Sequence, residues 1–203
     1  MTHPSHRRRV DYELIEELIP PGSHVLDLGC GDGQLLEELV SKKHVVGRGV
    51  EINETRVLDC VERGLAVYHG DILEGLELFG PGTFETVILS QTLQQTLDPR
   101  KVIKEMLRVG RRGIISFPNF GHWSMRLQLG FLGRMPRTRL LPYDWYDTPN
   151  VRQLTVRDFR EFAAGEGVKI LKEIFLTARG ARMTPVFENL RTSLAIFHVE
   201  RAG

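Results

Sequence analysis

Three alternate glycines follow directly on an apolar run near the start of the chain, in the segment 25–33, Val-Leu-Asp-Leu-Gly-Cys-Gly-Asp-Gly. The apolar run predicts a strand, and the pattern that begins at Gln34 predicts a helix. Glycine lets the backbone take positive φ and approach a ligand, and the free N–H groups of a helix N-terminus attract anions. The turn is therefore either a site for a small anionic cofactor or a structural tight turn. NAD and FAD are disfavoured, because their fingerprint needs a glycine at position 34.

The strand–turn–helix unit recurs along the chain. This alternation predicts a parallel sheet, and the nearly continuous apolar run 84–89 predicts a central strand covered on both faces. The pair Asp98-Pro99 predicts a capped helix start. The expected strands are 24–28, 45–50, 65–69, 84–89, 113–117, 168–178 and 192–199, and the expected helices are 12–19, 34–41, 54–63, 99–109 and 155–166, with a short helix or loop at 72–79.

The length of 203 residues fits one domain with one sizeable core. We expect the core to comprise about 12–117 and 151–200. The segment 118–150 breaks the alternation, because it is rich in aromatic residues, Arg, Gly and Pro and is too long for an ordinary connection. We interpret it as an inserted lid or a docking segment.

Composition excludes several classes of protein. The formal charge of +1 gives no overall attraction to nucleic acid or to an anionic membrane. No run approaches the roughly 18 apolar residues of a membrane span, and acidic residues follow the basic run 6–9 where a signal peptide would be apolar. Cys30 and Cys60 are too few and too far apart in the sequence for a disulfide framework or a zinc site. We therefore expect a cytoplasmic protein without a metal.

Three acidic residues end three successive predicted strands, at the edge where open α/β sheets bind ligands. Asp27 could meet an ammonium group or cap the following helix. Glu51, about twenty residues after the turn, could accept hydrogen bonds from two ribose hydroxyls or be a surface residue. Asp71 could accept from an adenine amine while the N–H of Ile72 reaches a ring nitrogen, or it could belong to a turn. Their recurrence at one edge favours a ligand site.

With these features, residues 23–117 resemble the class I S-adenosylmethionine (SAM) methyltransferases. The resemblance implies a Rossmann-like, doubly wound α/β fold with a mostly parallel seven-stranded sheet in one domain. It also implies that SAM or S-adenosylhomocysteine binds with its methionine part at the glycine turn, its ribose at Glu51 and its adenine at Asp71, without a metal. The candidate cofactor-binding residues are Asp27, Gly29, Cys30, Gly31, Gly33, Glu51, Ile52, Asp71, Ile72 and Ser90.

Motifs outside the cofactor site are similar to a narrower family, the methionine biosynthesis protein MetW family. They lie at 89–94, 108–112, 116–123 (Ser-Phe-Pro-Asn-Phe-Gly-His-Trp), 133–136 and 142–150. This resemblance implies a protein of methionine biosynthesis that works in a complex with a homoserine O-acyltransferase and is needed for full acyltransferase activity. SAM would then be a sensed ligand or a substrate. The alternative is a SAM-dependent methyltransferase acting on a small molecule.

The segment 118–150 holds the candidate catalytic residues for that alternative. Methyl transfer from a sulfonium needs an oriented acceptor, and a base only if the acceptor carries a proton. His122 is the first candidate base, with Tyr143 and Tyr146 behind it. Otherwise His122 and Trp123 simply pack the segment against the fifth strand.

The same segment could serve as a docking surface. Its four arginines, with no acidic residue among them, suit a carboxylate substrate, an acidic partner surface or a solvated face. An exposed apolar patch would favour a protein interface, whereas a deep polar pocket would favour catalysis. The arginines are Arg126, Arg134, Arg137 and Arg139, and the apolar residues in question are Phe131, Leu132, Met135 and Leu140.

Overall fold

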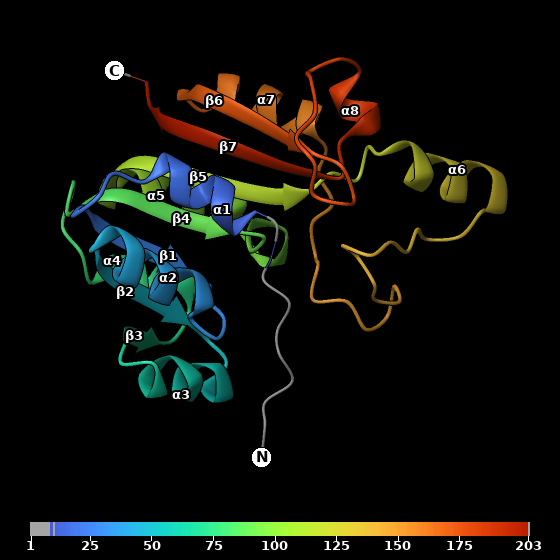
Figure 1. Ribbon diagram of the computed structural model, residues 1–203. Helices are drawn as coiled ribbons and strands as arrows, with labels where there is room; N and C mark the ends of the chain where they lie inside the picture. The colour runs from blue at the N-terminus through green and yellow to red at the C-terminus, as the bar shows by residue number, and fades with distance from the viewer. Residues whose placement is uncertain (1–8, 10, 203) are drawn as a thin grey trace.

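The computed structural model describes Arg9 and residues 11–202, so of the basic run 6–9 only Arg9 lies within the described residues. Figure 1 shows a twisted sheet with helices on both faces. The helices and strands are, in chain order, α1 (Tyr12–Leu18), β1 (His24–Leu28), α2 (Gln34–Lys43), β2 (Val46–Glu51), α3 (Glu54–Glu62), β3 (Ala66–His69), α4 (Ile72–Glu77), β4 (Phe84–Ser90), η1 (Leu93–Gln95), α5 (Pro99–Val109), β5 (Gly110–Pro118), α6 (Trp123–Leu132), α7 (Val156–Gly165), β6 (Val168–Leu176), α8 (Glu188–Arg191) and β7 (Leu194–Arg201).

The strands form one seven-stranded sheet in the order β3-β2-β1-β4-β5-β7-β6. Strands β1 to β5 pair in parallel, and β7 runs antiparallel to both β5 and β6. The predicted mostly parallel, doubly wound sheet is therefore confirmed. The chain order reverses between β1 and β4, which places the carboxyl ends of β1, β2 and β4 around one crevice, where such sheets bind ligands.

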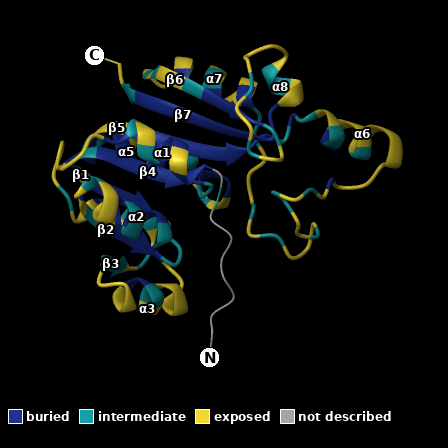
Figure 2. Cartoon of the chain, viewed as in Figure 1, coloured by how far each residue is buried: buried dark blue, intermediate teal, exposed yellow. Residues whose placement is uncertain are grey.

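Two apolar clusters cover the two faces of the sheet. One joins β-strand residues such as Leu28 and Phe197 to α5 and α7, and the other joins Val25 and Ile196 to α1 and α2. The strand residues alternate between the clusters because successive side chains of a strand point to opposite faces. Figure 2 shows the sheet as the buried centre of the molecule. The core holds the carboxyl ends of the strands, and hence the crevice, in fixed positions.

Local sequence signals account for where several helices begin. Asp98 accepts a hydrogen bond from the N–H of Lys101 and is followed by Pro99 at the first helical position, as predicted. Thr155 and Asp158 form a reciprocal capping box at the start of α7. These caps satisfy N–H groups that have no partner inside the helix.

The segment 118–150 contains a helix that the sequence analysis did not anticipate. Helix α6 is apolar on nearly every side, so it lacks the one-sided period that marks a helix packed on a core. His122 is its N-terminal cap, and Gly133, at φ 59°, is its C-terminal cap. Figure 1 shows α6 standing away from the sheet, with the chain returning below it. The short helix α8 was also not predicted.

None of the helices in the described part of the chain is long and apolar enough to cross a membrane. The same residues contain no group of three or more His, Cys, Asp or Glu side chains placed to hold a metal ion.

Candidate functional site

The glycine turn after β1 has the backbone geometry that its sequence predicts. Gly29, Gly31 and Gly33 all have positive φ, at 71°, 60° and 79°. A Cβ on Gly29 would lie 2.6 Å from Cγ2 of Thr92, and one on Gly33 would lie 2.5 Å from Cδ1 of Leu65. Only glycine takes these conformations without strain, so the turn can bring its backbone close to a ligand.

Glu51, at the end of β2, is buried against this turn. Its Oε2 accepts a hydrogen bond of 2.8 Å from the N–H of Gly31, and its Oε1 accepts from the N–H groups of Ile52 and Asn53 at 3.0 and 2.9 Å. The alternative that Glu51 is a surface residue is therefore wrong. A carboxylate has about four acceptor positions, so one remains for a ribose hydroxyl without displacing a backbone N–H.

Asp27 lies near the end of β1 and is almost completely buried. Its Oδ1 has no hydrogen-bond partner, and α2 has no side-chain cap, so Asp27 does not cap that helix. The pKa of Asp27 is raised to about 7, mainly by burial; Arg9 lowers it, and the nearby Glu51 and Asp11 carboxylates add to the increase. A buried carboxyl without a partner is costly. An ammonium group on a ligand would supply the missing partner.

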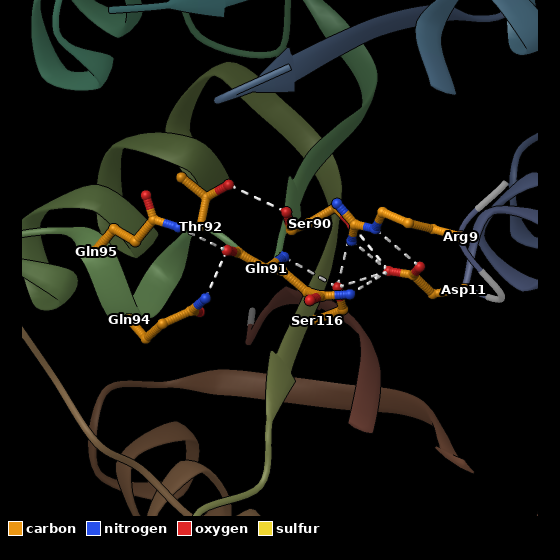
Figure 3. A network of polar contacts seen from close by, with 8 residues as sticks. All are labelled: Arg9, Asp11, Ser90, Gln91, Thr92, Gln94, Gln95 and Ser116. Atoms are coloured by element: carbon orange, nitrogen blue, oxygen red, sulfur yellow. Dashed lines mark hydrogen bonds and ion pairs between the residues drawn. The ribbon is translucent and has the colours of Figure 1, made fainter. Parts of the chain in front are cut away.

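A polar network closes the crevice on the β4 side, and Figure 3 shows it from close by. Arg9 donates to both carboxylate oxygens of Asp11, at 3.1 and 2.6 Å, and to Oγ of Ser90 at 2.8 Å. Ser90 and Gln91 in turn donate to Oδ2 of Asp11, at 3.2 and 3.1 Å. Asp11 and Ser116 are fully buried. The network ties the segment before α1 to the carboxyl ends of β4 and β5.

Arg9 and Asp11 were missed by the sequence analysis as site residues. They lie outside the strand–turn–helix pattern, in a basic-to-acidic stretch that was considered only as a possible signal peptide. Their contacts join residues about eighty positions apart, and no local spacing reveals such contacts. Tyr12 is also part of this wall, with the guanidinium of Arg9 4.9 Å from its ring centre.

Asp71 lies at the third strand end, where it caps a helix and lines the cleft. Its Oδ1 accepts from the N–H of Leu73 at 2.8 Å, and Oε2 of Glu74 accepts from the N–H of Asp71 at 3.3 Å, so Asp71 caps α4. Asp71 and Ile72 also line the same crevice as the glycine turn, and so does Ile52 at the end of β2. The capping contact agrees with the alternative that Asp71 belongs to a turn. The contact of Asp71 with an adenine amine stays a prediction.

All the candidate cofactor-binding residues except Asp27 and Gly33 line one cleft of about 1520 Å³. Asp27 is buried behind this lining. Typical small-molecule pockets measure about 300–1,000 Å³, so the cleft has room for a ligand of the size of SAM and a second molecule. Arg139, Leu140, Pro142, Tyr143 and Asn150 from the segment 118–150 form part of its wall. Among the described residues that line the cleft, none is His or Lys.

Cys30 and Cys60 meet behind the glycine turn, although they are far apart in the sequence. Their sulfur atoms lie 3.9 Å apart, and Sγ of Cys60 donates to the carbonyl oxygen of Gly31. Both are free and buried, and burial raises the pKa of each thiol. Because the thiolate is the reactive form, the raised pKa lowers the reactivity of both thiols, and Cys30 also lines the cleft.

The three candidate catalytic residues lie in different places. Tyr143 lines the cleft, whereas His122 and Tyr146 are not among the residues that line it. The Nδ1 of His122 accepts from the N–H of Ser124 at the start of α6, and burial lowers the pKa of His122. Tyr146 is largely exposed. Only Tyr143 is therefore placed near a ligand of the cleft.

The arginines of the segment 118–150 do not form one free patch. Arg137 pairs with Asp144 at 2.6 Å, and Arg126 donates to the carbonyl oxygen of Gly121 at 2.7 Å. Arg139 lines the cleft, and Arg134 is exposed just beyond the end of α6.

Comparison with known proteins decides the family. The family model described as "Methionine biosynthesis protein MetW" matches residues 9–199. The chain belongs to the MetW family. A relative from Rhodopirellula baltica, named "Bifunctional methionine biosynthesis protein MetXA/MetW", is 38% identical over 204 residues, which cover 94% of this chain and 33% of the relative. The chain thus spans about a third of that relative's length.

Other matches are more distant from this MetW protein. A "Ubiquinone biosynthesis O-methyltransferase" from Hahella chejuensis is 32% identical over 117 residues, 55% of this chain and 48% of the relative. Among solved structures, a SAM-dependent methyltransferase from Mesorhizobium loti has a TM-score of 0.69 at 14% identity, covering 95% of this chain and 98% of that one. The [4+2]-cyclase SpnF has a TM-score of 0.67 at 16% identity, covering 95% and 81%. These structures share the class I methyltransferase fold, and because one is a cyclase, the fold does not fix the reaction.

Proposed function

We propose that this MetW protein binds SAM and acts in the cytoplasm as the accessory, activating partner of a homoserine O-acyltransferase. The observation that carries the proposal is the Rhodopirellula relative, whose name joins MetXA to MetW and of which this chain matches only a third. The family resemblance implies that the partner is a homoserine O-acyltransferase. A fused relative keeps its two parts at high effective concentration, which is the arrangement expected for parts that act together.

SAM is the ligand that the cleft suits best. Arg9 lines the cleft and matches an α-carboxylate. Asp27 is buried behind the lining, and its unpartnered oxygen matches an α-ammonium group that would reach it there. The remaining acceptor of Glu51 suits a ribose hydroxyl, and Asp71 with Ile72 suits the adenine edge. SAM would bring a methyl group on a sulfonium, and the chain's residues would hold its amino acid and nucleoside parts. Neither nucleic acid nor a membrane is part of this proposal.

Methyl transfer to a small molecule is the second candidate function. The volume of the cleft favours it, because space remains beside a nucleoside ligand. Tyr143 could orient an acceptor there. Without His or Lys among the described lining residues, a protonated acceptor would have to lose its proton to a carboxylate or to solvent. The cleft therefore suits binding better than base-assisted transfer.

An activity assay of the partner tests the proposal. Homoserine O-acyltransferase from the same genome is assayed alone, with this chain, and with this chain plus SAM. We expect this chain to raise kcat and SAM to change the size of that increase. An unchanged kcat contradicts the accessory role. Transfer of label from methyl-labelled SAM to an acceptor in the same mixtures would instead establish the methyltransferase function.

A further inference from the structure

Exposed apolar side chains lie on several sides of helix α6, and three of them form one continuous stripe. Trp123, Leu127 and Phe131 are spaced at i, i+4 and i+8, so they lie one above another along the helix. They are 50%, 44% and 82% exposed. Gly130 lies beside the stripe, and a Cβ placed there would meet no atom within 4 Å. The stripe is therefore open along its whole length.

Other contacts fix α6 from a different side. Gln128 exchanges two hydrogen bonds with the backbone of Arg137, at 3.1 and 3.3 Å, and the ion pair between Arg137 and Asp144 holds the returning chain together. Met125 is buried at the base of the helix. These contacts leave the stripe uncovered while they hold α6 in a defined position. An exposed apolar row on a positioned helix is the form in which helices dock into grooves of other proteins.

We propose that the stripe Trp123, Leu127 and Phe131 docks into an apolar groove on the acyltransferase, with Arg134 facing an acidic group on the rim of that groove. This inference rests on the proposed accessory function. The fused relative argues for this occupant, because its MetW part is joined to MetXA in one chain. The charge around the stripe is compatible with an acidic group on the partner, since no acidic residue lies between His122 and Arg139 and Arg134 is exposed. Exposed aromatic and arginine side chains are the usual anchors of protein interfaces.

The test is a binding titration with matched variants of the full chain. In the stripe variant, Leu127→Gln is combined with Phe131→Gln, because glutamine keeps helix propensity and removes the apolar surface. The control combines Leu58→Gln with Val61→Gln on α3, where both side chains are also exposed, at 58% and 57%. We expect the stripe variant to bind purified homoserine O-acyltransferase at least about 30-fold more weakly, the effect of losing one interface hot spot. The control should bind like the wild type.

Several outcomes would overturn the inference. Equal binding by the stripe variant and the wild type contradicts docking on α6 and leaves the accessory role intact, whereas a wild-type chain that binds no acyltransferase contradicts the accessory role itself. Unchanged acyltransferase affinity together with loss of self-association, or with loss of binding to phosphatidylglycerol vesicles, would assign the stripe to a second copy or to a membrane. SAM affinity and melting temperature of both variants should match the wild type, which shows that they fold. Arg134→Glu gives a second readout, with a smaller loss of affinity expected.

Discussion

Gly31 and Glu51 join the two halves of the candidate cofactor site, because the N–H of Gly31 donates to Oε2 of Glu51 over 2.8 Å. The glycine turn after β1 and the acidic end of β2 therefore form one unit. A carboxylate that accepts backbone N–H bonds fixes the position of the turn, and it does so before any ligand contacts it. Both the shape of the turn and the ribose contact consequently depend on the charge of Glu51.

Glu51→Gln should weaken SAM binding by on the order of 1.5–3 kcal/mol, because hydrogen bonds to charged groups lie in that range. The amide keeps the shape of the side chain but offers one acceptor oxygen in place of two. Calorimetry with SAM measures the change, and Glu77→Gln, at an exposed position on α4, is the control. Unchanged affinity for the Glu51 variant would show that this carboxylate only supports the backbone.

A panel of ligands should separate the cofactor classes. We expect SAM and S-adenosylhomocysteine to bind and NAD not to bind, because Gln34 stands where the dinucleotide fingerprint needs glycine. Calorimetric titration of the wild-type chain with each ligand provides the comparison. Binding of NAD without binding of the other two would contradict the cofactor assignment.

The order of strands and helices could be predicted because it depends on local signals. Apolar runs, the glycine turn and the Asp98-Pro99 pair each act within a few residues, and the structure contains every predicted strand, with ends shifted by a few residues. The fifth strand begins at Gly110 rather than Gly113, since pairing with β4 starts there. The seven-stranded topology itself came from the family resemblance.

The parts that could not be predicted depend on contacts between residues distant in sequence, or they belong to a helix that stands away from the core. The Arg9–Asp11–Ser90 network and the meeting of Cys30 with Cys60 arise only when the sheet is assembled. Helix α6 gave no amphipathic period because its apolar side chains face several directions. The strand-end acids were predicted at the right edge, yet their backbone contacts, such as the three N–H bonds to Glu51, were not.

The pKa of Asp27, raised to about 7 mainly by burial, predicts a pH dependence of SAM binding. The ligand's ammonium group needs the ionised carboxylate, and below pH 7 the free protein holds Asp27 protonated. SAM affinity should therefore fall about tenfold for each pH unit below 7, with a proton released on binding. Titrations in buffers of different ionisation enthalpy measure that release. 5′-Methylthioadenosine, which lacks the amino acid group, should bind with no such dependence.

The raised pKa of Asp27 also predicts how the free energy of unfolding of the ligand-free protein depends on pH. The pKa of Asp27 is about 7 in the folded chain and about 3.9 when unfolded, so between these values the folded state binds more protons than the unfolded state. The contribution of Asp27 to the free energy of unfolding therefore falls as pH rises from about 4 to 7, by at most about 4 kcal/mol. Asp27→Asn removes the buried charge and should raise the free energy of unfolding at pH 8 relative to the wild type, while their difference shrinks toward pH 4. Urea unfolding at several pH values measures this difference.

Asp27→Asn should also weaken SAM binding and leave 5′-methylthioadenosine binding unchanged, which separates a ligand-binding carboxyl from a structural one. A variant that is less stable than the wild type at pH 8 and loses both ligands equally would show that Asp27 supports the fold and does not meet the ammonium group.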